Sequence, residues 1–181
     1  MGSHTQNVLL ALVFATFYAG IYRLTQSSGL YHSLIDFNPW LFYPPAFIRL
    51  AAFLVIGFWS IPALFLAGLC CIDFGLSFGG IIIVSAFCAV GGPLGVDLAA
   101  KLIALRPNLE NLTPHRLLML SFGCAVGNAI FLKMGLSLAD YETSKMPDYL
   151  SIVIGDTLGT WVMLYLAKIA IMIFGVSVAK R

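Results

Sequence analysis

The sequence predicts an all-α protein, a polytopic transmembrane helix bundle of about six spans with both termini in the cytoplasm. Apolar residues make up 60% of the 181 residues and charged residues only 10%, and the mean hydropathy is +0.96. A soluble domain carries about a quarter charged residues, so this chain has too few charges to cover a surface in water. The apolar residues also fall in stretches close to the ~20 residues that a bilayer-crossing helix requires. We therefore expect a lipid bilayer around the chain.

Six apolar stretches within a single integral membrane domain, residues 1–181, define the predicted spans. They lie at about residues 8–24, 44–58, 61–74, 81–105, 115–133 and 148–178. No basic segment precedes the first span, so it is expected to be retained and not cleaved as a signal peptide. Pro44 and Pro45 open the second span, where proline suits the first helical turn. A tight turn at residues 59–62 separates it from a short third span, which Pro62 opens.

The remaining spans carry other helix signals. Gly91-Gly92-Pro93 lies within the fourth span and predicts a kink. Thr113 and Pro114 suit the N-cap and the first helical position before the fifth span. The sixth span is longer than a bilayer requires, which predicts a tilt or an end outside the membrane.

Basic residues predict the orientation, because loops on the cytoplasmic side carry an excess of lysine and arginine. Six spans place both termini on one side, together with Lys101, Arg106, Arg116, Lys180 and Arg181. The basic residues on the other side are Arg23, Lys133 and Lys145. The excess predicts cytoplasmic termini in a multi-pass protein of a bacterial inner membrane.

Two ionisable residues inside the spans predict a polar centre. Arg49 lies in the second span and Asp156 in the sixth, at similar depth from the non-cytoplasmic surface. Ionisable side chains at such depth are costly and usually face a partner or a cavity, so we expect these two to meet. The pair has two interpretations: a structural ion pair that fixes packing, or a site for a polar ligand or a proton.

Three further polar residues are weaker candidates for that site. Asp97 and Lys101 are four residues apart, a spacing that favours a local ion pair on one helix face. Asn128 is an amide within the fifth span and should hydrogen-bond across helices. A structural role is favoured for all three.

Glycines four residues apart let two helix backbones approach closely. Three such pairs fall within the spans: Gly91/Gly95, Gly123/Gly127 and Gly155/Gly159. Packing within the bundle is the favoured interpretation, and a docking face for another membrane protein is the alternative.

The sequence shows no pattern typical of a catalytic, metal or nucleic-acid site. It has no Ser/His/Asp or Cys/His constellation and no phosphate-binding glycine loop, and its four cysteines lack a metal-ligand spacing with histidine. A net charge of +2 without a basic run excludes a nucleic-acid footprint. We expect a non-enzymatic protein, and no cofactor is identified. Aromatic residues offer stacking surfaces for a pigment, quinone or vitamin, although core or interfacial roles are favoured: Phe42, Tyr43, Trp59, Trp161 and Tyr165.

Several short motifs resemble the first type of membrane-associated sensor domain. The matching residues are Trp40, Pro44, Pro45, Arg49, Gly57, Pro62, the run from Gly123 to Ala129, Gly155, Asp156 and Gly159. The resemblance extends over roughly residues 38–168. Such domains are usually fused to histidine kinase, diguanylate cyclase or phosphodiesterase modules, and they receive a signal in the membrane, sometimes from a partner protein. This chain has fewer predicted spans than that family and no such module, so the resemblance implies a stand-alone subunit.

Two functions therefore remain open. The first is a sensor-like membrane subunit that binds a partner membrane protein or assembly. The alternative is a substrate-binding transport subunit similar to the S component of energy-coupling-factor transporters, which binds a vitamin in a pocket. In that case Arg49, Asp156 and nearby aromatic residues would line the pocket.

Overall fold

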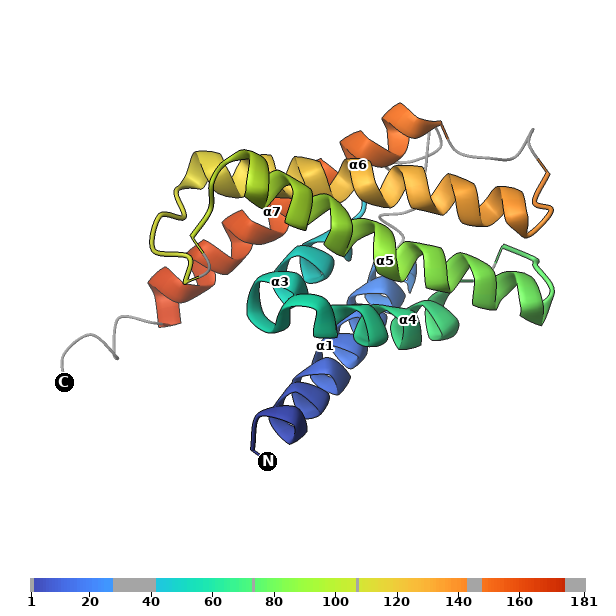
Figure 1. Ribbon diagram of the computed structural model, residues 1–181, viewed down its shortest axis with the longest axis horizontal. Coiled ribbons are helices and arrows are strands. Elements are labelled where there is room, and N and C mark those ends of the chain that lie inside the picture. Colours follow the sequence, from blue (N-terminus) through green and yellow to red (C-terminus); the bar gives the residue numbers. More distant parts are fainter. Residues whose placement is uncertain (1, 28–41, 73, 107, 143–147, 175–181) are drawn as a thin grey trace.

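The computed structural model describes residues 2–27, 42–72, 74–106, 108–142 and 148–174. Within these residues it contains helices and short connections but no strand (Figure 1). In chain order the elements are α1 (Gly2–Ser27), α3 (Ala46–Ile56), the 3₁₀ helix η1 (Gly57–Trp59), α4 (Ser60–Cys71), α5 (Phe78–Leu102), α6 (Pro114–Leu138) and α7 (Tyr149–Phe174). The predicted all-α class is confirmed.

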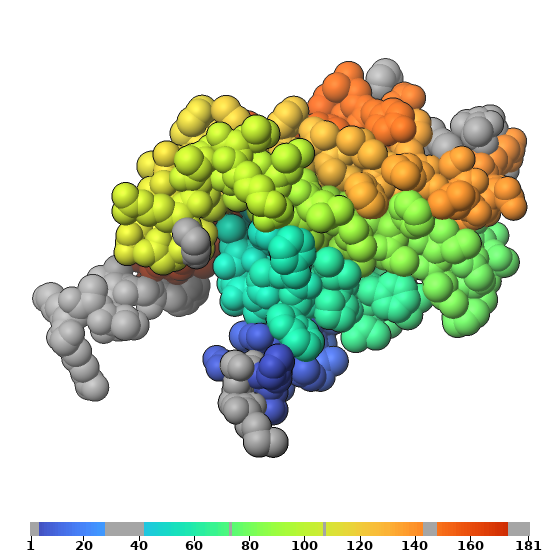
Figure 2. Space-filling model, viewed as in Figure 1, coloured from blue at the N-terminus to red at the C-terminus, as the bar shows by residue number. Residues whose placement is uncertain are grey.

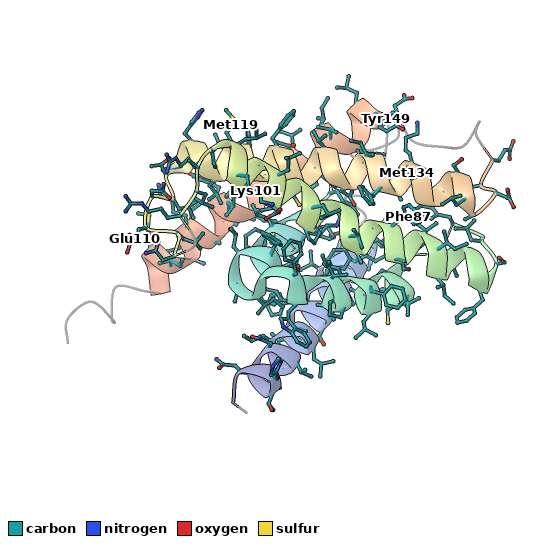
Figure 3. All side chains as sticks on the ribbon, in the orientation of Figure 1. Phe87, Lys101, Glu110, Met119, Met134 and Tyr149 are labelled. Carbon is teal, nitrogen blue, oxygen red and sulfur yellow. The ribbon has the colours of Figure 1, made fainter. Side chains whose placement is uncertain are left out.

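Five helical stretches among the described residues are long and apolar enough to cross a membrane. They are His4–Ser27, Ala46–Cys71, Phe78–Leu102, Pro114–Leu138 and Tyr149–Ile173. The outside of the bundle is apolar as well: Met119 and Met134 point away from it on α6 and are 43% and 47% exposed (Figure 3). Large exposed apolar surfaces of this kind suit a bilayer. The structure therefore agrees with a helical membrane protein.

The structure has five such stretches where the sequence predicted six spans, because predicted spans 44–58 and 61–74 belong to one stretch. α3 has 11 residues and α4 has 12, so at ~1.5 Å per residue neither reaches the ~30 Å of a bilayer core. The predicted turn at residues 59–62 is also displaced, since η1 joins the two helices. Gly57 at its start has φ 57°, a left-handed conformation that favours glycine and ends α3. Pro62 lies in the first turn of α4.

The other predicted spans coincide with helices, with ends shifted by a few residues. Thr113 caps α6 as predicted, because its side chain accepts a hydrogen bond from the backbone N–H of Arg116. The predicted kink at Gly91-Gly92-Pro93 does not interrupt α5, which remains helical from Phe78 to Leu102. The end of the predicted sixth span, beyond residue 174, lies outside the described residues.

α5 and α6 run antiparallel side by side (Figure 1), and four glycines bring their backbones into contact. A Cβ atom on Gly95 would meet the backbone of Gly123, and one on Gly127 would meet the carbonyl oxygen of Gly91. The predicted pairs Gly91/Gly95 and Gly123/Gly127 therefore pack against each other inside the bundle, as close helix contacts in membranes require.

The third glycine pair brings α7 against the segment that leads into α3. The backbone N–H of Tyr43 donates to the carbonyl of Gly155 at 3.0 Å. A Cβ atom on Gly159 would collide with the backbone of Tyr43, and Pro44 and Pro45 are buried at this junction. α3 therefore begins beside the first half of α7 and not at an end of the bundle.

α1 packs along α4 on one side of the molecule, where Figures 1 and 2 show it against α3 and α4. Its residue Ala11 lies with Ile56 and Ala63, and Tyr18 lies with Leu64. Ala11 and Tyr18 are the buried apolar residues of the helix among the described side chains, and its N-terminal half is largely exposed. Tyr18 is the point at which α1 reaches the centre of the bundle.

Candidate functional site

Arg49 of α3 and Asp156 of α7 form an ion pair at the centre of the bundle. Nη1 of Arg49 donates to Oδ2 of Asp156 at 2.7 Å, and the two side chains are 7% and 5% exposed. The junction between Tyr43 and Gly155 sets this geometry, because it places the first turn of α3 beside α7. The two residues are 107 positions apart, and the structure brings them together as predicted.

Asn128 of α6 completes the contacts to the carboxylate. Its Nδ2 donates to the same Oδ2 of Asp156 at 2.7 Å. Three helices thus meet at one oxygen atom, and a buried carboxylate gains both a charged and a neutral donor. The predicted cross-helix role of Asn128 agrees with this contact.

Two tyrosines enclose the guanidinium on its other side. Nη2 of Arg49 donates to the hydroxyl of Tyr18 at 3.0 Å, and the hydroxyls of Tyr18 and Tyr43 are 2.8 Å apart. The guanidinium carbon lies 5.7 Å from the centre of the Tyr18 ring and 5.2 Å from that of Tyr43, within cation–π range. Sequence reasoning missed Tyr18. The sequence feature that could have identified Tyr18 is its position in the middle of an apolar span, since a buried tyrosine hydroxyl needs a hydrogen-bond partner.

The remaining predicted residues lie outside this centre. Lys101 donates to Asp97 at 2.6 Å, but the lysine side chain is 72% exposed, so the pair is a local contact at one end of α5. Trp161, considered for stacking, instead donates from Nε1 to the hydroxyl of Ser121 at 2.9 Å. Trp40 lies outside the described residues.

A cavity of about 220 Å³ adjoins the ion pair. Its polar lining residues are Tyr18, Tyr22, Gln26, Tyr43, Arg49, Asn128 and Asp156. Its other lining residues are Leu64, Gly68, Ile72, Phe74, Cys88, Leu132 and Ile152. The polar centre therefore forms part of the wall of a largely apolar space, the arrangement that small-molecule sites share.

The size of the cavity limits what it can hold. A buried apolar cavity of ~150 Å³ holds a benzene molecule, and pockets for drug-sized ligands begin near ~300 Å³. At about 220 Å³ the space lies between these limits. A molecule of one ring with a short substituent, or a chain of similar volume, is the right size.

The described residues hold no group of three or more His, Cys, Asp and Glu side chains that could bind a metal. Comparisons with protein-family models, with curated proteins and with solved structures find no match to the chain. Fold and site together define a helical membrane protein with a buried Arg–Asp–Asn centre in the wall of a small cavity.

Proposed function

We propose that this protein is a non-enzymatic, multi-pass protein of a bacterial inner membrane that binds a small, largely apolar molecule in the cavity beside Arg49 and Asp156. One observation carries the proposal: the polar centre adjoins the cavity. A purely structural ion pair is best enclosed by packed side chains, because any gap beside it forfeits contacts. Buried ion pairs also contribute little net stability, which favours a role beyond packing.

The alternative, a subunit that binds a partner membrane protein, rests on the resemblance to sensor domains and on α1. Only 11% of the apolar stretch of α1 is buried, against 33–39% in the other four stretches. A helix of a partner protein would cover this exposed face. The glycine pairs no longer support docking, because they are occupied within the bundle.

Both termini are proposed to lie on the cytoplasmic side, because the chain reverses direction between α3 and α4. α3 runs from Arg49 beside Gly92 towards the C-terminal end of α5, where Phe53 and Ala100 pack against the same buried cluster. α4 runs back, so that Gly68 lies against Ser85 in the N-terminal half of α5. This reversal supports an even number of passes.

Mass spectrometry of the gently extracted protein tests the proposal. We expect one defined small molecule per chain with the wild type, and its loss with Leu132→Phe, which places a larger side chain in the cavity wall. Leu158→Phe is the matched control, because Leu158 is 43% exposed on the outside of α7 and does not line the cavity. A stoichiometric protein partner without any small molecule would instead establish the alternative.

A further inference from the structure

We infer that the ligand of this cavity is an uncharged amphiphile whose hydroxyl or amide N–H donates a hydrogen bond to Oδ1 of Asn128. The inference rests on the proposed function and specifies its ligand. Asn128 is 2% exposed and lines the cavity. Its Nδ2 is bonded to Asp156, whereas its Oδ1 has no partner among the described residues.

An unpaired amide oxygen in this position needs a donor. A buried acceptor without a partner loses its hydrogen bonds to water and gains nothing in return. Four buried side-chain atoms of the described residues lack a partner, and the other three belong to Ser60, Ser85 and Thr157. None of those three residues lines the cavity, so Asn128 is the one among these four whose unpaired atom belongs to a residue of the cavity wall.

The charges beside the cavity argue for an uncharged ligand. Arg49 and Asp156 neutralise each other, and the two terminal nitrogens of Arg49 already donate to Asp156 and to Tyr18. A charged ligand would lose its hydration without gaining a free counter-charge, which is costly in an apolar space.

The rest of the wall fits an apolar body. Leu64, Leu132, Ile152 and Phe74 contribute hydrocarbon surface, and the volume of about 220 Å³ admits one ring and a short chain. A small alcohol or primary amide with an aromatic or aliphatic body can donate the hydrogen bond, carries no charge and has an apolar part that fits the cavity.

Matched probe molecules test this inference on the purified full-length protein. 2-Phenylethanol and propylbenzene have nearly the same shape, and only the alcohol donates a hydrogen bond. Binding is measured as the rise in the unfolding temperature of the protein. This rise depends on the free ligand concentration and on Kd. The free concentration is corrected for ligand that partitions into empty micelles. We expect the preference for the alcohol over propylbenzene to be about 5–10-fold greater in the wild type than in Asn128→Leu, the effect of one hydrogen bond.

Two further probes keep the test independent of that variant. The methyl ether of 2-phenylethanol accepts but does not donate, and we expect it to bind the wild type about 5–10-fold more weakly than the alcohol. 2-Phenylethylammonium donates but is charged, and we expect no binding. Equal affinity of the wild type for alcohol and ether, or binding of the ammonium as tight as that of the alcohol, would overturn the inference.

The possible failures are distinguishable. If the alcohol and propylbenzene both bind, both are lost in Leu132→Phe, and their ratio is unchanged in Asn128→Leu, the cavity is a binding site but the role of Asn128 is wrong. A water molecule that stays on Asn128 would give this result. If no probe binds the wild type, the proposed function itself is contradicted.

Discussion

At the scale of single residues, the centre of the protein is a set of polar groups that support one another. Each of Arg49 and Asp156 is costly alone in a membrane interior, and each has a second contact, to Tyr18 and to Asn128 respectively. The meeting of Arg49 and Asp156 was predictable from their similar depth in two apolar spans. For Tyr18 the sequence indicated only that a phenol within an apolar span needs a partner, and the partner was not predictable because the sequence does not specify which face of α1 meets the bundle.

The ion pair predicts non-additive effects on stability. Asp156→Asn should lower the free energy of unfolding in detergent by about 3 kcal/mol, since it leaves the charge of Arg49 buried and unpaired. The same change should cost about 1–3 kcal/mol less in an Arg49→Leu background. Asp97→Asn breaks the exposed pair with Lys101 and should cost less than about 1 kcal/mol. Additive effects of the two central changes would show that Arg49 and Asp156 do not interact.

At the scale of helices, small residues decide which elements meet. The glycine spacing predicted close contacts, and the structure assigns their partners: α5 with α6, and α7 with the segment before α3. Hydropathy placed spans 44–58 and 61–74 correctly as apolar segments but not as one interrupted stretch. The hydropathy of a segment indicates only how long and how apolar it is. The directions of α3 and α4 depend instead on the backbone conformation at Gly57.

Alanine substitutions test the contact between α5 and α6. Gly95→Ala should lower the free energy of unfolding by about 1–3 kcal/mol or more, because the added Cβ atom meets backbone that cannot rotate away. Gly20→Ala on α1 is the matched control. No heavy atom lies within 4 Å of its added Cβ atom, and alanine favours a helix over glycine. Equal effects of the two changes would contradict the packing.

At the scale of the whole molecule, composition predicted a helical membrane protein, and the described fold agrees. The number of spans was less predictable, because α3 is too short to cross a bilayer and begins beside α7. The cavity was not predictable either, since residues from six helices line it and no local sequence pattern indicates that these helices leave a space between them.

The proposed orientation predicts which connections are accessible from outside the cell membrane. A cysteine replacing Glu142, between α6 and α7, should react with a membrane-impermeant thiol reagent on intact spheroplasts. A cysteine replacing Glu110, between α5 and α6, should react only after the membrane is disrupted. The wild-type chain measures the background from its own cysteines. The reverse pattern of labelling would invert the orientation.

An experimental density map of the protein purified from its native membrane would show whether the cavity holds a ligand. We expect density for one small molecule between Tyr43, Asn128 and Leu132, with one atom within hydrogen-bonding distance of Oδ1 of Asn128. A cavity closed by side chains, or filled by ordered water alone, would show that the Arg49–Asp156 centre is a packing device and not part of a binding site.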